Sequence, residues 1–388
     1  MPGNASLNQL GYDCGDNRVG HNRFMSETAY TRAAEVAYQG SFLDFVRDEV
    51  RDSRFVYLFL ALFVTATLVQ SAWRGDEFLP LLGVYLLRSC RAVALLASAA
   101  FAVIAVQVLV ERHDRPAREI GRRLRRMAAN GSMSRFGFAC AVLALFMAAF
   151  LYNKMLIPVL NPFDWDETFI AWDKALFGGH HPWQLLHPVL GYPAITLALD
   201  VVYTAWVPMV FVFWAGLLAS EKVPSELRRR YWVTTMLSWV LIGLVMAIVF
   251  SSAGPCFLPA LLPEAAAPYR DLNLYLAELN NDWGLGSSVA KGFLWSAYVG
   301  AVGEPGGISA MPSMHNAQAA LFAAVAYSIN RRLGHVMLAY AALIFIASIH
   351  LAWHYAVDGI IGIAAALLVW FAVGAISGRS NRTRHQPA

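Results

Sequence analysis

The chain has 388 residues, of which 58% are hydrophobic and only 14% are charged. Soluble globular chains carry about 25% charged residues, so this composition excludes an ordinary soluble protein. The formal net charge of +4 does not by itself indicate a partner, and we expect membrane lipids around the protein and no nucleic-acid partner.

The first 54 residues are polar and lack the short apolar stretch of a cleaved signal peptide. Apolar residues recur at helical spacing between 42 and 50, among charged neighbours, which predicts an amphipathic helix. This helix either lies on the inner membrane surface or packs on the protein. The four cysteines, Cys14, Cys90, Cys140 and Cys256, are scattered and indicate neither a disulfide framework nor a zinc cluster.

Long apolar stretches dominate the rest of the chain, and most reach the roughly 20 residues that cross a bilayer as a helix. We therefore predict an all-α, polytopic membrane protein with about eight transmembrane helices. The expected spans are 55–73, 81–110, 136–158, 193–219, 231–253, 313–330, 335–351 and 354–376.

Lys and Arg gather in alternate loops between these spans. The loops 111–135 and 220–230 and the turn Arg331-Arg332 are rich in them, whereas the longer loops 159–192 and 254–312 are poor. Positive loops stay in the cytoplasm, so both termini are predicted to be cytoplasmic. We expect the protein in the inner (plasma) membrane of a bacterium, with the two longer loops on the periplasmic side.

These two outer loops interleave aromatic and polar residues over 162–190 and 256–300. Aromatic rings prefer the membrane interface, so the segments either anchor the protein there or form a roof over a site that opens sideways to lipid.

Three ionisable side chains fall at the outer mouth of the last three spans. His315 begins the sixth span, and His354 and Asp358 open the eighth. Residues four apart share one face of a helix, so Asp358 can hold one imidazole nitrogen of His354 and leave the other free to attack. His315 can then protonate a departing oxygen. These three residues are our candidate catalytic set.

The approach to His315 suits an anion. Gly306 and Gly307 lead through Pro312-Ser313 into the sixth span, and backbone amides at a helix N-terminus attract phosphate. Gly307 and Ser313 are therefore candidate phosphate-binding residues, although Ser313 also suits a plain N-cap.

The stretch GGISAMPSMHNAQAALFA at 306–323, followed by HYAVDG at 354–359, resembles the type 2 phosphatidic acid phosphatase superfamily, and within it the inositol phosphorylceramide synthase-like branch. The resemblance implies a six-helix core over 136–376, with His354 as nucleophile, Asp358 as its partner and His315 as acid. It divides the chain into a cytoplasmic segment (1–54), two extra spans with a basic loop (55–135), the core, and a cytoplasmic tail (377–388).

The sequence departs from the family pattern at its cationic positions. Met314 replaces a Gly, and Ala347-Ser348 replace a Ser-Arg pair. The first family motif, Lys followed later by Arg-Pro, is absent after the fifth span, and a near-match from Lys154 to Asn161-Pro162 is interpreted as coincidence. The remaining candidates to hold phosphate are Arg270, Lys291, Lys154 and His350.

We therefore expect an enzyme that hydrolyses or transfers a phosphoryl group of a lipid phosphate or phospholipid donor, with no cofactor and no metal. The motif leaves open whether water or an alcohol accepts the phosphoryl group. Its resemblance to the synthase-like branch favours transfer to an alcohol. Asp200, inside the fourth span, is expected to be structural or to bind a substrate hydroxyl. The competing interpretations are a proton-coupled transporter, which the lack of repeated halves disfavours, and a non-catalytic lipid-binding subunit.

Overall fold

The computed structural model describes residues 42–75, 78–129, 131–220, 223–300 and 306–384. Within these ranges every regular element is a helix and no strand is present, which confirms the predicted all-α class. The expectations for residues 1–41, Cys14 included, lie outside the described residues.

The predicted amphipathic segment is α2 (Phe42–Asp52). Its Phe45 is buried against the ring of Phe138, with ring centroids 5.8 Å apart, whereas Leu43 is 74% exposed. One apolar side chain of α2 therefore packs on the protein, and another remains uncovered.

Seven helical stretches among the described residues are long and apolar enough to cross a membrane. They are Arg54–Arg74, Val93–Val110, Ser132–Leu160, Pro193–Ala219, Ser225–Val249, Arg331–His350 and Ala356–Ser377. The chain is thus a polytopic membrane protein.

The sixth expected span, 313–330, corresponds to the helix α17 (Met314–Ile329), which has 16 residues. At 1.5 Å per residue it is about 24 Å long, shorter than the roughly 30 Å hydrocarbon core. It is buried along most of its length and packs against α18 (Arg331–His350) and α19 (Ala356–Arg384). A buried core helix and a short membrane span are equally apolar, so composition alone does not distinguish the two for α17.

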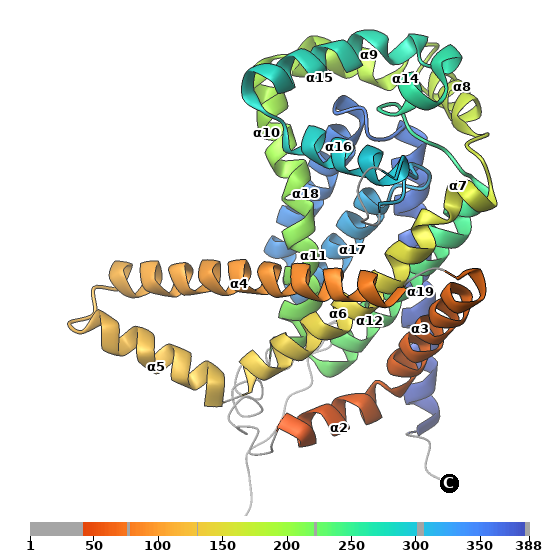
Figure 1. Ribbon diagram of the computed structural model, residues 1–388. Coiled ribbons are helices and arrows are strands. Elements are labelled where there is room, and N and C mark those ends of the chain that lie inside the picture. Colours follow the sequence, from red (N-terminus) through yellow and green to blue (C-terminus); the bar gives the residue numbers. More distant parts are fainter. Residues whose placement is uncertain (1–41, 76–77, 130, 221–222, 301–305, 385–388) are drawn as a thin grey trace, which may run out of the picture. The chain divides into compact units, whose positions relative to one another are not determined.

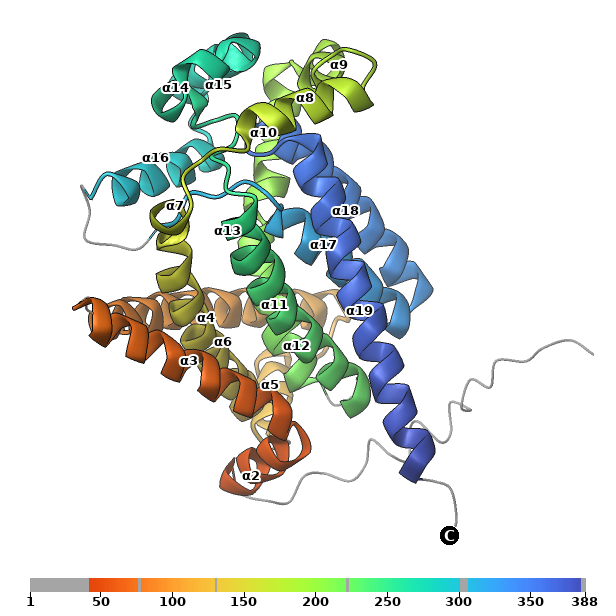
Figure 2. The same cartoon turned by 90° about the vertical axis from the view of Figure 1, so that its right-hand side faces the viewer.

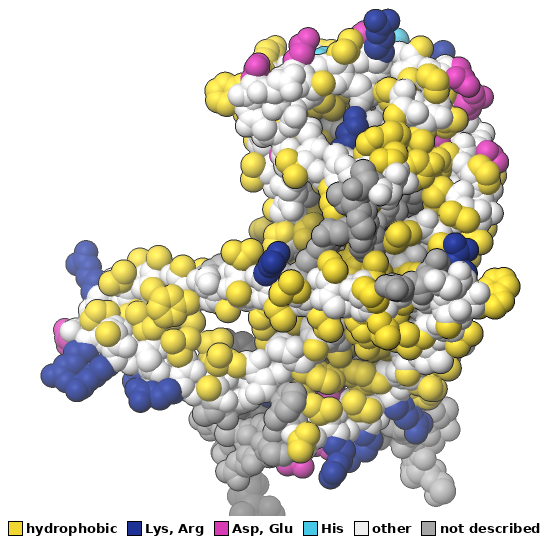
Figure 3. All heavy atoms as spheres, viewed as in Figure 1, with side chains coloured by type: hydrophobic (Ala, Val, Ile, Leu, Met, Phe, Trp, Pro, Cys, Tyr) yellow, Lys and Arg dark blue, Asp and Glu magenta, His cyan; other side chains and the backbone are white. Residues whose placement is uncertain are grey.

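Three further helices lie between α2 and the predicted core: α3 (Arg54–Arg74), α4 (Phe78–Val110) and the basic α5 (Pro116–Ala129). α4 runs crosswise to α18, as Figures 1 and 2 show. Its 33 residues carry a row of exposed apolar side chains, including Leu95, Phe101 and Val106. In Figure 3 hydrophobic side chains cover α4, and Lys and Arg side chains gather at its far end beside α5.

The predicted core contains α17 to α19 and an earlier group of helices. This group is α6 (Ser132–Met155), α7 (Ile157–Leu160), α10 (Pro193–Thr204), α11 (Trp206–Ala219), α12 (Ser225–Val240), the π-helical turn η1 (Leu241–Met246) and α13 (Ala247–Val249). α6 packs against α11, and α12 packs against α19. Pro208 explains the break between α10 and α11, because it cannot donate a backbone hydrogen bond to the preceding turn.

The two longer loops form short helices rather than extended linkers. They are α8 (Asp166–Leu176), α9 (Pro182–Leu190), α14 (Leu258–Leu261), the 3-10 turns η2 (Pro263–Ala265) and η3 (Ala267–Tyr269), α15 (Arg270–Trp283) and α16 (Gly286–Tyr298). α8, α9, α14 and α15 lie together at one end of the bundle, beyond α10 and α18, in both ribbon views.

Two glycines let α19 approach its neighbours closely next to Asp358. A Cβ at Gly362 would lie 2.6 Å from the Ser313 carbonyl oxygen, and one at Gly359 would lie 2.7 Å from the Phe345 ring. The start of α19 is therefore held against the start of α17, where the two sequence motifs meet.

Candidate functional site

His315 lies in the first turn of α17. Ser313 begins this helix as its N-cap: its side-chain oxygen accepts a hydrogen bond from the Asn316 amide. The Ser313 amide donates to the backbone oxygen of Asp358 at 3.0 Å. Ser313 is therefore the N-cap that the sequence allowed, and it does not line the cavity described below.

Two aromatic rings enclose the imidazole of His315. Tyr203 stacks on it with ring centroids 4.5 Å apart and an interplanar angle of 14°, and the Trp206 ring centroid is 4.2 Å away. The Trp206 indole also donates to the His315 carbonyl oxygen. These residues flank the break between α10 and α11, so the break directs both rings to His315.

His354 lies in a short loop that joins α18 to α19. Ala352, two residues after the end of α18, lies in the left-handed region with φ of 60°. The amides of Trp353 and His354 both donate to the Ser348 carbonyl oxygen at 3.0 Å. The Ser348 hydroxyl in turn accepts from the Asn316 side chain. Ser348, which stands where the resembled family has Arg, therefore holds the loop that carries His354.

Asp358 contacts His354 as the spacing predicted. Its Oδ2 lies 3.3 Å from His354 Nδ1 and also accepts the Tyr355 amide at 3.1 Å, and Asp358 is fully buried. When Asp358 is ionised it only accepts, so this contact places the proton of the His354 ring on Nδ1.

Two further carboxylates, from α8, hold this region in place. Asp173 accepts the amides of Ala356 and Val357 at 2.8 and 2.9 Å, which caps the N-terminus of α19. Asp166 accepts the hydroxyl of Tyr355 at 2.8 Å, and it also binds two loop amides, those of residues 253 and 254. Burial raises the pKa of both carboxyls, that of Asp173 to about 7.

The sequence interpretation missed these two carboxylates as positioning residues. Asp166, Phe169 and Asp173 are buried on one side of α8, and their spacing of three and four residues is the pattern of a buried helix face. That spacing was visible in the sequence, but the partners on α19 were not.

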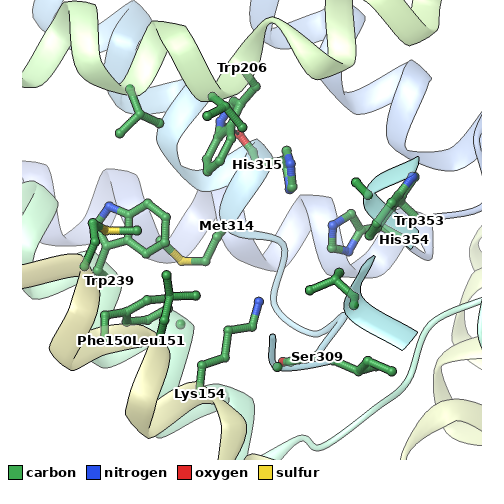
Figure 4. A pocket seen from close by; sticks show the side chains of 18 of the residues that line it. Phe150, Leu151, Lys154, Trp206, Trp239, Ser309, Met314, His315, Trp353 and His354 are labelled. Carbon is green, nitrogen blue, oxygen red and sulfur yellow. Dashed lines mark hydrogen bonds between the residues drawn. The ribbon is translucent and has the colours of Figure 1, made fainter. Parts of the chain in front are cut away.

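Both histidines line one cavity of about 400 Å³. Their ring centroids are 5.8 Å apart, and Figure 4 shows both side chains at this cavity, with Met314, Ser309 and Trp353 around them. Tyr203 lines the same cavity, and its hydroxyl has no hydrogen-bond partner in the described part of the chain. The cavity also extends along apolar side chains of α6 and α11, among them Met147, Leu151, Val210 and Phe211.

Lys154 lies at the end of α6. Among the described residues, no other Lys and no Arg lines this cavity. Figure 4 shows it reaching into the space that the two histidines face. No ion pair of Lys154 is formed within the described residues. An unpaired amine in an apolar cavity favours an anionic ligand, so among the candidate cations of the sequence Lys154 is the one that lines this cavity.

Of the other predicted phosphate ligands, only Gly307 lines this cavity. Gly307 lines the cavity, and a Cβ there would lie 2.6 Å from the Lys154 carbonyl oxygen, so this glycine allows close backbone approach. Lys291 lines a neighbouring cavity. Arg270 is exposed and lines neither cavity. His350 is buried and its Nε2 lies 2.9 Å from the Thr196 hydroxyl.

Arg270 and His350 therefore do not line this cavity. Arg270 starts α15 at the surface, and His350 ends α18 facing α10. Both were chosen by residue type, and sequence alone did not give the direction in which each side chain points.

Asp200 has the structural role. Its carboxylate accepts the amides of Gly286 and Ser287 at 2.8 and 2.9 Å, and thereby caps α16. Phe257 and four residues of α16 line the cavity with His315, so part of the segment 256–300 packs against this cavity.

A helical membrane bundle with two histidines, a buried carboxylate and a lysine around one cavity has the arrangement of a membrane-embedded enzyme. Residues 167–372, just over half of the chain, match the PAP2 superfamily, and the chain belongs to this superfamily. Membership indicates phosphatase or phosphotransferase activity. The matched range contains both histidines and Asp358, whereas Lys154 precedes it. No curated protein and no solved structure matches the chain.

Proposed function

We propose that the protein is a lipid-phosphate phosphatase or phosphotransferase that works through a phosphohistidine on His354, at the outer face of the membrane. The observation that carries the proposal is the shared cavity: His315 and His354 both line it, and Asp358 contacts the latter imidazole on the nitrogen that does not react.

In the first step, Nε2 of His354 attacks phosphorus and forms a P–N bond, while the P–O bond to the leaving group breaks. His315 donates its proton to the departing oxygen. Asp358 stabilises the positive charge that develops on the His354 ring, and the Lys154 amine offsets negative charge on the phosphoryl oxygens.

In the second step, water or an alcohol attacks the phosphohistidine. Its proton passes to His315, a P–O bond forms, and the P–N bond to His354 breaks. The enzyme returns to its starting state. The sequence of residues 306–323 resembles the inositol phosphorylceramide synthase-like branch, and this resemblance favours an alcohol acceptor.

A lipid donor is supported by the apolar part of the cavity. Side chains of α6 and α11 extend it into the bundle away from the histidines, which suits a hydrocarbon chain. Each buried CH₂ group contributes about 0.8 kcal/mol to binding, so a chain placed there would raise affinity for lipid over soluble phosphates.

The outer face is supported by the positions of the basic residues. Arg331 begins α18, whose other end reaches His350 beside the loop of His354, and the three arginines at 228–230 lie at the opposite end of α12 from the cavity-lining Gly243 of η1. If these basic ends face the cytoplasm, the histidines lie on the opposite side.

The test is turnover of a panel of lipid phosphates by the purified protein in detergent. Wild type is expected to release phosphate or transfer it, and His354→Ala is expected to do neither. The turnover rate of His315→Ala should fall about 10²–10⁴-fold with an alkyl leaving group. It should fall much less with an activated aryl phosphate, because an activated aryl leaving group needs no proton. Activity in His354→Ala, or an equal loss with both substrates in His315→Ala, would contradict the assignment.

A further inference from the structure

The apolar arm of the histidine cavity runs along α6. Lys154, Phe150 and Leu143 of this helix all line the cavity, and at 1.5 Å per residue they extend over about 16 Å. Phe150 and Leu143 are buried, as are Val210 of α11 and Trp239 of α12 in the other walls. A hydrocarbon chain whose phosphate lies at Lys154 therefore passes Phe150 on its way toward Leu143.

Met314 lines this arm at the level of Phe150. It immediately precedes His315, lines the same cavity and is 8% exposed. In Figure 4 its side chain extends away from His354 toward those of Phe150 and Trp239. Where the resembled family has Gly, this protein therefore has a long side chain in the wall of the arm, next to the histidines.

Gly243 makes room for this side chain. It lies in the π-helical turn η1 and lines the cavity. A Cβ at Gly243 would lie 2.9 Å from Cε2 of Phe150 and 3.2 Å from Sδ of Met314, and both distances are shorter than ordinary van der Waals contact. The wall formed by these three residues is therefore close-packed, and no group can be added to it unless Phe150 or Met314 moves into the arm.

We infer that Met314 is a specificity-determining residue for the lipid chain. It narrows the arm beside the phosphate and selects donors whose chain is unbranched over its first carbons, in preference to donors with methyl branches there. The inference rests on the proposed function and specifies the shape of the chain. A methyl group placed against a close-packed wall has to displace its side chains, and such overpacking lowers an equilibrium constant about fivefold or more.

The chemical step does not distinguish the two kinds of donor. In both, His354 forms the same P–N bond while the P–O bond to a primary alcohol breaks. A difference between the donors therefore measures how well the chain fits the arm.

The experiment uses two phosphonates that bind but cannot be hydrolysed, dodecylphosphonate and 3,7,11-trimethyldodecylphosphonate. They have the same main-chain length and differ only in their methyl branches. Each competes with tritiated dodecylphosphonate for the purified protein in detergent, and the readout is the Kd of the branched phosphonate divided by that of the straight one. Partition into detergent micelles is the same for every variant, so it cancels when this ratio is compared between variants.

Met314→Ala removes the side chain beyond Cβ and should lower the ratio by about fivefold or more, because the branch then fits into the vacated space. Gly243→Ala pushes Phe150 and Met314 toward the arm and should raise the ratio. Phe150→Leu trims the same wall and should also lower the ratio, which keeps the inference testable if Met314→Ala fails to fold.

Two matched controls lie outside the cavity wall. Met133→Ala truncates a methionine that is 54% exposed, and Gly216→Ala adds a Cβ that meets nothing within 4 Å. Neither residue lines the cavity, so both variants should stay within about twofold of the wild-type ratio. An unchanged ratio in Met314→Ala, or a shift in the same direction in Met314→Ala and Gly243→Ala, would refute the inference.

Turnover of the corresponding alkyl phosphates separates this inference from the proposed function. If wild type turns over dodecyl phosphate but none of the variants changes the preference between straight and branched chains, the function stands and the role of Met314 is disproved. If the Kd ratios shift as expected in a protein that turns over neither phosphate, Met314 selects the chain of a bound lipid and the proposed function is disproved. A wild-type protein that binds neither phosphonate would overturn the inference.

Discussion

Asp173 offers a sharp test of how the nucleophile is positioned. The site contains no direct contact between Asp173 and His354. Instead, the Asp173 carboxylate binds the first two amides of α19, and this helix begins two residues after His354 and carries Asp358. Removing the carboxylate should therefore change both stability and chemistry.

The expected magnitude follows from the two hydrogen bonds. Ala356 and Val357 are buried, and each buried amide left without a partner costs about 1–3 kcal/mol, whereas N-cap replacements by Ala cost about 0.5–2 kcal/mol. For Asp173→Ala we expect a destabilisation of about 2–4 kcal/mol. A shift of the His354 loop by about 1 Å would lower kcat by about 10²-fold.

The assay combines thermal unfolding in detergent with turnover of a lipid phosphate. The control is Glu167→Ala, which removes an exposed carboxylate from the first turn of the same helix and should change neither quantity appreciably. Asp173→Asn keeps one acceptor oxygen and should be intermediate. If Asp173→Ala melts at the wild-type temperature and turns over within twofold of wild type, the capping argument is refuted.

Three further predictions concern pH, backbone packing and topology. Because burial raises the folded-state pKa of Asp173 to about 7 from 3.8, its neutral form stabilises the fold fully below about pH 4, and this contribution is lost as pH rises through about 7. Between pH 5 and pH 8 the melting temperature should therefore fall more for wild type than for Asp173→Asn. An equal fall in both proteins would contradict this. Gly307→Ala places a Cβ 2.6 Å from the Lys154 carbonyl oxygen, so it should lower kcat/KM at least tenfold, and an unchanged value would separate this glycine from the site. In a cysteine-free background, an impermeant thiol reagent applied outside should label a cysteine at Asp282 but not one at Ala128, and the reverse pattern would place the histidines on the cytoplasmic side.

The fold class and the central residues were predictable because they depend on local patterns. Apolar runs identify helices without reference to their neighbours. His354 and Asp358 are close in the sequence, although His354 reaches Asp358 from the loop before α19 and not from the same helix face. For α17, burial by other helices and burial by lipid select the same residue types, so its apolar sequence does not say which of the two covers it.

The rest of the site depends on contacts between distant parts of the chain. Asp173 and Ala356 are far apart in the sequence, as are Trp206 and His315, and neither pair has a local signature. Lys154 reaches the cavity from a helix that precedes the family match, so its importance could be judged only once α6 was placed beside α11. By contrast, His350 was predicted to bind phosphate only because it is a histidine. At the end of α18 its ring contacts Thr196 instead.

The central claim is that phosphate is held covalently on His354. It is tested most directly by mixing the protein with ³²P-labelled lipid phosphate, quenching in alkali, where phosphohistidine survives, and mapping the label by mass spectrometry. The account predicts label on the peptide that contains His354, lost in His354→Ala and retained longer when no acceptor alcohol is present. Turnover without any trapped label, or label on His315 instead, would contradict it.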